Sequence, residues 1–438
     1  MIISNKKVLE VVRLSLEEYR KKYAYGEDYG TRYFKFGPIA DKPEVIENRG
    51  LFLAGDQSVV YKIFGISKQI VVGPEVINYL GSREEVARYL VYPMKDGVID
   101  RGDERAWQVL YELTVYGFKK ALEKVGGDFE GFYVTAALSA IAPDYMYEKI
   151  FDMHVKIDRE LKAVKAITII PQPLAVAIAQ KTVTCVVVES GHGNTQITPI
   201  SMYPIRNAVL SLNRGGAEAD AITAEILRDL GYEDRASEEK FVRMFKEAVG
   251  LIPLDLDEAI AKAKENPERF RVKYKVPGTR IEIDMEDKSW MRFLIGEIIF
   301  NPEHEIFESY YSRGMPRPRD TIIGDERIRG TMPLSEAIEE SVSKTSVELQ
   351  PSLFRKIILS GGNFAWKVPS DMRDVAVDAA TKIKKQLSDI GIEASVELTK
   401  DPVYSVWKGC IVYSLAVPDD YSWNWERREG WFKRGEHY

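Results

Sequence analysis

Apolar and polar positions along the chain alternate between a helical and a strand-like period. From Leu9 to Tyr23, apolar residues recur at spacings of three and four, which predicts an amphipathic helix near the N-terminus. A hairpin is expected next, with a turn at Gly30 and a return strand over residues 33–36.

The middle of the chain alternates strands with helices. Residues 166–170 form an apolar run typical of a buried strand, 173–180 a short helix and 182–189 a second strand, and a third strand is expected to end at Ile200. This alternation favours an α/β fold with partly parallel sheets.

Other segments add detail. Short apolar runs over residues 51–72 predict a small β-rich insertion, and Asp103 is expected to cap a helix that begins at Glu104. Residues 309–333 contain five arginines, three prolines and three glycines, which predicts a long surface loop. Apolar spacing predicts a helix over residues 372–387.

Composition narrows the class of protein. The chain has 438 residues, of which 45% are hydrophobic and 29% charged, as in ordinary globular proteins. A net charge of −6 argues against a nucleic-acid binder. Neither a transmembrane segment nor a signal peptide is expected. Because Cys185 and Cys410 lie far apart in the sequence and the four histidines lack ligand spacing, no zinc site is expected and a reducing cytoplasm is the simplest setting.

Three turns share one design, in which a strand ends in small residues. They cover residues 28–31, 189–193 and 360–363. Glycine lets successive backbone N–H groups approach a phosphate. The acidic residues that begin the first two turns suit a hydrated Mg²⁺. Each turn alone is more often a plain tight turn, and neither a P-loop nor a Rossmann pattern is present.

The order of six segments along the chain resembles the actin family. Residues 28–37 and 189–200 resemble its two phosphate loops. Residues 242–247 and 359–362 resemble its adenosine-binding helix and loop, and residues 92–99 and 404–409 resemble its connecting segments. Their spelling resembles the archaeal branch often called crenactin more than eukaryotic or bacterial actins.

The resemblance implies the actin-like ATPase fold, which is ribonuclease-H-like: two similar α/β domains, with four subdomains, around a nucleotide cleft. Domain I would comprise residues 1–179 and 404–438, with subdomain 2 inserted at about 51–92. Domain II would comprise residues 180–403. Within it, subdomain 3 would cover about 180–214 and 306–403, and subdomain 4 about 215–305.

The resemblance also implies ATP or ADP with Mg²⁺ as cofactors. Asp28 and Glu189 would hold the metal through water, and Gln172, Gln196 and Glu189 would be catalytic. Adenine would lie between the helix that carries Lys246 and Glu247 and the loop that contains Gly361 and Gly362. The residues expected to contact nucleotide are Gly30, Thr31, Arg32, Lys35, Ser190, Gly191, His192, Gly193, Asn194, Gly216, Arg243, Lys246, Glu247, Gly361, Gly362, Asn363 and Trp366.

Four positions depart from the actin pattern. Glu189 stands in place of an aspartate and Gln196 in place of a histidine. A neutral amide orients water but does not take its proton, so the site is expected to position its nucleophile more than activate it. Arg32 replaces a glycine, so a less close approach of the backbone to phosphate is expected there. His192 replaces an acidic residue and is expected to be a loop contact.

The implied function is that of a cytoplasmic, cytoskeletal ATPase that polymerises with copies of itself and hydrolyses ATP slowly in the filament. Accessory cytoskeletal proteins would be further partners. Candidate filament contacts are residues 51–70 and 309–333. Two alternatives stay open: an actin-related scaffold that binds ATP without polymerising, and a phosphotransferase or chaperone ATPase of the same superfamily.

Overall fold

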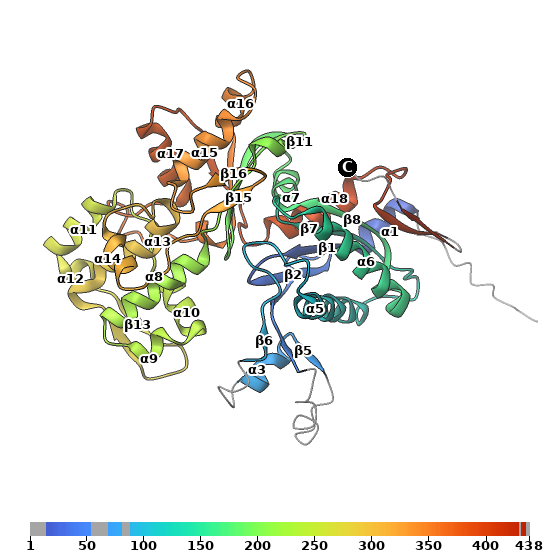
Figure 1. The fold of residues 1–438 in the computed structure, drawn as a ribbon, viewed down its shortest axis with the longest axis horizontal. Helices are drawn as coiled ribbons and strands as arrows, with labels where there is room; N and C mark the ends of the chain where they lie inside the picture. The colour runs from blue at the N-terminus through green and yellow to red at the C-terminus, as the bar shows by residue number, and fades with distance from the viewer. Residues whose placement is uncertain (1–14, 54–68, 81–87, 429–430, 435–438) are drawn as a thin grey trace, which may run out of the picture.

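Two large mixed sheets organise the chain in a computed structural model, which describes residues 15–53, 69–80, 88–428 and 431–434. The sheets lie in two lobes that are joined near the middle of the molecule (Figure 1). Each lobe has its own large cluster of buried apolar side chains.

The first lobe contains a seven-stranded sheet in the order β20-β19-β8-β7-β1-β2-β3. Strand β1, next to the central strand β7, runs parallel to β7 and antiparallel to β2, and every residue of β1 is buried, including Glu27 and Asp28. The strands are β1 (Ala24–Tyr29), β2 (Tyr33–Pro38), β3 (Glu44–Glu47), β7 (Phe132–Leu138), β8 (Val164–Pro171), β19 (Trp425–Arg428) and β20 (Trp431–Arg434).

The second lobe contains a six-stranded sheet in the order β11-β10-β9-β17-β18, with β12 paired to β10. Strand β17 runs parallel to β9, so the two strands end at the same edge of the sheet. The strands are β9 (Thr184–Ser190), β10 (Thr195–Ser201), β11 (Tyr203–Pro204), β12 (Leu210–Leu212), β17 (Ile357–Ser360) and β18 (Val396–Leu398).

Helices cover both sheets, and three small sheets lie outside them. The first lobe carries α1 (Leu16–Tyr23), α3 (Glu75–Leu80), α5 (Glu104–Leu122), α6 (Asp144–Leu161) and the sheet of β4 (Gly50–Phe52), β5 (Ile70–Val72) and β6 (Leu90–Val91). The second lobe carries α8 (Gly216–Asp229), α9 (Glu233–Ala236), α10 (Glu239–Val249), α11 (Leu256–Glu265), α12 (Pro267–Phe270), α13 (Arg292–Phe300), α14 (Ile306–Ser312), α15 (Leu334–Ser343), α16 (Gln350–Phe354), α17 (Ala379–Asp389) and the hairpins β13 (Lys273–Lys275) with β14 (Glu282–Asp284) and β15 (Thr321–Ile323) with β16 (Glu326–Ile328).

The lobes are joined through two helices, α7 (Gln172–Ala179) and α18 (Ser405–Ala416), which pack against each other. A third cluster of buried residues between the lobes includes Val176, Val187 and Cys410. A Cβ at Gly409 would lie 1.8 Å from the carbonyl oxygen of Ala175, so the close packing of the two helices requires glycine at this position.

Several predicted elements are confirmed. Asp103 caps α5, because its Oδ1 accepts a hydrogen bond from the Ala106 N–H at 3.0 Å. Strand β8, helix α7 and strands β9 and β10 follow the predicted alternation. The N-terminal helix is present from Leu16, after a capping box at Ser15, while its predicted start at Leu9 lies outside the described residues.

The helix predicted over residues 372–387 begins too early. Helix α17 starts at Ala379, and Asp378 caps it by accepting a hydrogen bond from Thr381 N–H at 2.7 Å. Met372 and Val375 are buried, but they lie in an irregular segment that precedes the helix. Their apolar spacing therefore reflects packing and not helical continuity.

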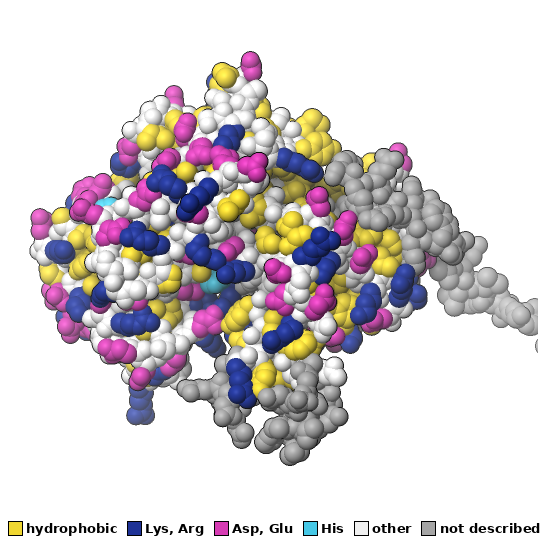
Figure 2. Space-filling view, viewed as in Figure 1, with side chains coloured by type: hydrophobic (Ala, Val, Ile, Leu, Met, Phe, Trp, Pro, Cys, Tyr) yellow, Lys and Arg dark blue, Asp and Glu magenta, His cyan; other side chains and the backbone are white. Residues whose placement is uncertain are grey.

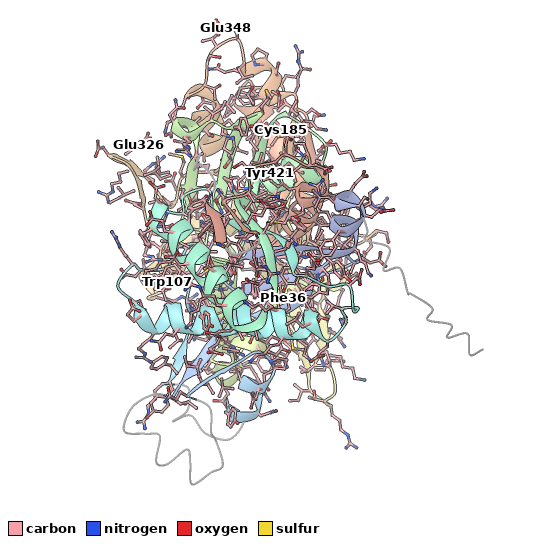
Figure 3. All side chains as sticks on the ribbon, turned by 90° about the vertical axis from the view of Figure 1, so that its right-hand side faces the viewer. Phe36, Trp107, Cys185, Glu326, Glu348 and Tyr421 are labelled. Carbon is pink, nitrogen blue, oxygen red and sulfur yellow. The ribbon has the colours of Figure 1, made fainter. Side chains whose placement is uncertain are left out.

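The segment predicted as a surface loop, residues 309–333, is irregular over most of its length but contains some regular structure. It begins with the end of α14 and includes the β15–β16 hairpin. Arg214 is fully buried and donates hydrogen bonds from Nη1 to the carbonyl oxygens of Gly330 and Met332, both at 2.8 Å, which anchors the end of the segment. Glu326, on the hairpin, stands out from the body of the molecule (Figure 3).

Charged side chains of both signs occur on the face shown in Figure 2, and acidic and basic ones are interspersed there. In the described ranges, no helix combines the length and the apolar character that crossing a bilayer requires.

Candidate functional site

A cleft of about 620 Å³ lies between the lobes, and all three glycine turns contribute to its wall. This volume falls in the usual range for small-molecule sites. The turns follow β1, β9 and β17, so the strand ends of both sheets open into one space.

The first two turns touch each other across the cleft. A Cβ at Gly193 would lie 2.9 Å from Thr31 Oγ1 of the opposite turn. The same hydroxyl accepts a hydrogen bond from the Gly97 N–H at 3.0 Å, and Asn194 Nδ2 donates to the carbonyl oxygen of Asp96 at 3.1 Å. The short segment at Asp96–Gly97 therefore links the two turns.

The third turn is locked to the second. Gly361 has a φ of +104°, and a Cβ there would lie 2.1 Å from the carbonyl oxygen of Ser190. Only glycine combines this backbone conformation with such a close approach. Asn363 Nδ2 donates hydrogen bonds to the Gly191 carbonyl oxygen at 2.6 Å and to Ser190 Oγ at 3.0 Å.

Two carboxylates line the cleft, those of the buried Asp28 and the half-buried Glu189. Lys35 Nζ contacts Asp28 Oδ2 at 2.6 Å. Burial lowers the pKa of Lys35, but the neighbouring Asp28 outweighs this effect and the pKa is raised overall. Glu189 Oε2 is buried without a hydrogen-bond partner. Burial, and then the charge of Asp28, raise the pKa of Glu189 to about 8, although Lys35 opposes the rise.

These residues fit a hydrated Mg²⁺ carried by a polyphosphate. The partnerless Glu189 oxygen and the excess of carboxylates over cations leave room for a further positive charge. Mg²⁺ prefers oxygen ligands and keeps several of its waters. The N–H groups of the two glycine turns would hold the phosphate oxygens.

The two glutamines predicted to be catalytic both line the cleft, each with one end already engaged. Gln172 Nε2 donates to Asp28 Oδ1 at 2.8 Å and to the Tyr29 carbonyl oxygen at 3.2 Å. Gln196 Oε1 accepts from Ala140 N–H at 2.6 Å and from Ser139 Oγ at 3.1 Å, which ties β10 of the second lobe to the end of β7 in the first.

The sequence match decides the family to which this architecture belongs. A family model described as Actin matches residues 91–416, which is most of the chain. The chain belongs to the actin family. This membership confirms the predicted α/β fold of the actin-like ATPases, and proteins of the actin family generally bind ATP or ADP and are ATPases.

One curated relative in the actin family is Actin-related protein 3 of Schizosaccharomyces pombe (strain 972 / ATCC 24843). It is 25% identical over 241 residues, which cover 53% of this chain and 51% of the relative. The chain therefore matches about half the length of that protein.

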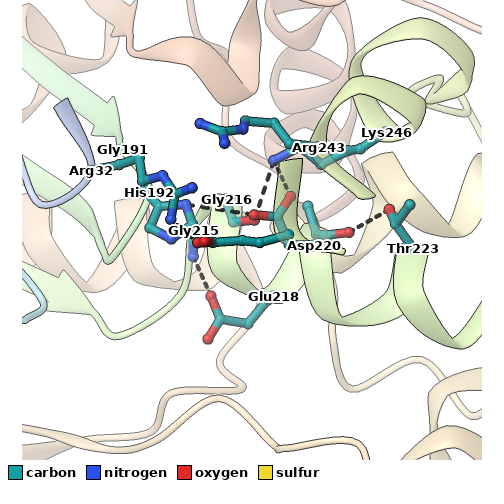
Figure 4. A network of polar contacts seen from close by, with 12 residues as sticks. Arg32, Gly191, His192, Gly215, Gly216, Glu218, Asp220, Thr223, Arg243 and Lys246 are labelled. Carbon is teal, nitrogen blue, oxygen red and sulfur yellow. Dashed lines mark hydrogen bonds and ion pairs between the residues drawn. The ribbon is translucent and has the colours of Figure 1, made fainter. Parts of the chain in front are cut away.

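In this member of the actin family, the start of α8 faces the second turn. Gly216 N–H donates to the Gly191 carbonyl oxygen at 2.9 Å, and Lys246 Nζ on α10 contacts Asp220 at 2.7 Å (Figure 4). Asp220 also lies 3.9 Å from His192 Nδ1. Burial lowers the pKa of His192 to about 4, so the ring is neutral at pH 7 and serves as a loop contact.

Most of the residues predicted for the site line the cleft. The exceptions are Ser190 and Gly193. Ser190 is fully buried, with its hydroxyl 2.7 Å from Thr195 Oγ1, and Gly193 packs against the Thr31 side chain. The residues of the prediction that line the cleft are Asp28, Gly30, Thr31, Arg32, Lys35, Gln172, Glu189, Gly191, His192, Asn194, Gln196, Gly216, Arg243, Lys246, Glu247, Gly361, Gly362, Asn363 and Trp366.

Sequence reasoning missed several residues of the cleft. Arg292 lines it and donates from Nε to the Val249 carbonyl oxygen at 2.8 Å, with 9% of the residue exposed. A cation at the start of the apolar run 292–300 is the signal that could have identified it. The cleft is also lined by Tyr33, Gly97, Lys367 and other residues, which no pattern in the sequence marks as part of the site.

Proposed function

We propose that this chain binds ATP with Mg²⁺ in the cleft, polymerises into filaments that depend on the nucleotide, and hydrolyses ATP slowly in the polymer. The observation that carries the proposal is the contact between the turns at Thr31 and Gly193, with Asp28 and Glu189 lining the same cleft. A triphosphate held by both turns would crosslink the lobes.

The proposed chemistry is an in-line attack of water on the γ-phosphate. Bound Mg²⁺ supplies positive charge at the phosphate oxygens. Lys35, held by Asp28, adds a second positive charge. Because the Gln172 nitrogen is committed to Asp28 and Tyr29, its carbonyl oxygen is the atom available to accept a hydrogen bond from water. Neither Gln172 nor Gln196 takes a proton, which fits slow hydrolysis.

Adenine is proposed to lie beyond the phosphates, between α10 and the Gly361–Gly362 turn. Lys246, Glu247 and Trp366 line this end of the cleft. The division into domain I (residues 1–179 and 404–438) and domain II (180–403) is proposed as well, and the two sheets with their separate buried clusters support it.

Membership of the archaeal, crenactin-like branch is proposed on the residues of the six motif segments. A cytoplasmic location is proposed because the proposed role is cytoskeletal. Accessory cytoskeletal proteins are proposed as partners beside the homopolymer. The β15–β16 hairpin, with Ile322 75% exposed, is a candidate filament contact.

A second candidate function is that of an actin-related scaffold that binds ATP without polymerising. The similarity to a protein named actin-related, over about half its length, favours this alternative. A phosphotransferase would need a carboxylate base beside the γ-phosphate, where this chain has Gln172 and Gln196.

Light scattering of the purified chain tests the proposal. Adding ATP and Mg²⁺ should produce a large rise in scattering that EDTA reverses, with filaments in electron micrographs and slow phosphate release. Nucleotide binding without a rise in scattering would favour the scaffold. A chain that binds no nucleotide would overturn the proposal.

A further inference from the structure

A group of charged residues spans the mouth of the cleft. We call it the cleft-lip cluster; it consists of Arg32, Glu47 and Arg49 from the first lobe and Glu239 and Arg243 from α10 of the second lobe. Arg32 and Arg243 line the cleft itself, whereas the two glutamates are not among its lining residues.

Contacts of the cleft-lip cluster cross between the lobes in both directions. Arg32 forms an ion pair with Glu239 on α10 and lies 3.4 Å from Glu47. Arg243 on α10 reaches back to Glu47, with Nη1 to Oε1 at 3.1 Å, and donates to the Tyr33 hydroxyl. Each glutamate therefore holds an arginine of the other lobe.

Neighbouring groups strengthen the crossing at Glu239. The Tyr92 hydroxyl donates to Glu239 Oε2 at 3.2 Å, and an Arg49 Nη1 lies 3.9 Å from the same oxygen. Arg49 also pairs with Glu47. The first lobe thus presents several donors to a single carboxylate at the start of α10.

Charge and burial differ within the cluster. Three arginines share two carboxylates, so one positive charge is in excess. The Arg32 side chain is 6% exposed and its Nε is buried without a partner, whereas the Glu239 side chain is 47% exposed. Burial, and then the charge of Arg243, lower the pKa of Arg32. The cations thus lie inside, facing the space proposed for nucleotide, and the carboxylates hold them from outside.

We infer that Glu47 and Glu239 are positioning residues of the nucleotide site, which hold Arg32 and Arg243 across the cleft mouth and so set how long a bound nucleotide stays. The inference rests on the proposed function. Release of nucleotide requires the lobes to part, and parting breaks the ion pairs of the cluster. These pairs therefore slow dissociation without taking part in the attack on phosphate.

The test measures dissociation of a fluorescent ATP analogue, chased with excess ATP, from the wild type and from Glu239→Gln. Dissociation from the variant should be about three- to tenfold faster, as expected for loss of an ion-pair network. Glu239→Asp should give an intermediate rate. Since Glu239 is half exposed, high salt should bring the wild-type rate close to that of Glu239→Gln.

Glu238→Gln is the matched control. Glu238 precedes Glu239, is exposed, and pairs with Arg235 of its own lobe at 2.5 Å. This variant should dissociate at the wild-type rate. The single-turnover rate of phosphate release is measured in the same variants. In Glu239→Gln the dissociation rate should change by a larger factor than this rate, because a structural defect at the phosphates would change both and a positioning role at the cleft mouth acts mainly on dissociation.

The outcomes separate this inference from the proposed function. A wild-type chain that takes up no analogue overturns the nucleotide site and this inference with it. A wild-type chain that binds the analogue, but releases it as fast as Glu239→Gln does at low salt, overturns the inference alone. Should Glu239→Gln not fold, Glu47→Gln is expected to show the same acceleration, and an unchanged rate there would overturn the inference.

Discussion

The side-chain amide of Gln172 donates a hydrogen bond to Asp28 Oδ1 at 2.8 Å, across 144 residues of sequence. Gln172 is the first residue of α7, and Asp28 lies near the end of β1. Lys35 Nζ holds the other oxygen of Asp28 at 2.6 Å. Each carboxylate oxygen of Asp28 therefore contacts a neighbouring side chain. The hydrogen bond from Gln172 to Asp28 also fixes the orientation of the Gln172 amide.

Replacing Gln172 with alanine should slow phosphate release about ten- to a hundredfold, because the water would lose the group that orients it. Nucleotide affinity should change little, since the turns that hold the phosphates remain. Phosphate release and fluorescent-nucleotide binding would be measured side by side. Gln180→Ala, at the C-terminal end of the same helix, is the control, and wild-type turnover in Gln172→Ala would remove Gln172 from the mechanism.

Gly361→Ala should destabilise the chain by about 2 kcal/mol or more, because the position combines a φ of +104° with a Cβ site 2.1 Å from the Ser190 carbonyl oxygen. Gly362→Ala is the matched control, since a Cβ at Gly362 meets nothing within 4 Å. Thermal unfolding should show a lower midpoint for the first variant alone. Equal midpoints for the two variants would contradict the account of this turn.

Much of the fold and of the site was predictable from local pattern. The convergence of the second and third turns follows from their strands, because the parallel β9 and β17 finish at one edge of the same sheet. The first turn follows β1 of the other sheet, and its approach depends on how the lobes meet. The buried polar strand β1 was harder to recognise. Glu27 lies fully buried there because His154 Nε2 contacts its carboxylate at 2.7 Å, a partner 127 residues away.

Other features were not predictable because they depend on how the lobes meet. The contact between Arg243 and Glu47 joins residues 196 apart and exists only when α10 lies against the first lobe. The β15–β16 hairpin escaped prediction because each of its strands is only three residues long and its anchor, Arg214, is distant in sequence.

Acid should destabilise the chain through His192. Burial lowers the pKa of this group to about 4 from its ordinary value of 6.5, so the unfolded chain takes up a proton before the folded chain does. The stability due to the neutral ring is complete above pH 6.5 and is lost as the pH falls towards 4. With the His192 side chain one-quarter exposed, the loss should be about 1–3 kcal/mol.

Denaturant unfolding at pH 7 and pH 4.5 would measure this loss. His192→Asn should show a smaller decrease in stability over the same range, because asparagine does not titrate. Carboxylates elsewhere contribute to the decrease in both proteins, so the comparison between them isolates the histidine. The same decrease in both would show that His192 does not contribute.

The last prediction concerns the β15–β16 hairpin and rests on the proposed filament. Removing residues 321–328 and joining Asp320 to Arg329 through two glycines should reduce filament yield in a pelleting assay while ATP still binds. The ends of the cut already lie close together, because Asp320 Oδ1 accepts a hydrogen bond from Gly330 N–H at 3.1 Å. The carbonyl oxygens that Arg214 holds, at Gly330 and Met332, lie outside the deletion.

A point variant tests the exposed surface of the hairpin while leaving the hairpin itself in place. Ile322→Ser changes a side chain that is 75% exposed, so it should reduce filament yield without lowering the thermal midpoint. Val347→Ser is the control, because Val347 is equally exposed, at 74%, but lies between α15 and α16. If both variants pellet like the wild type, the hairpin is a surface excursion of this chain and the filament contacts lie elsewhere.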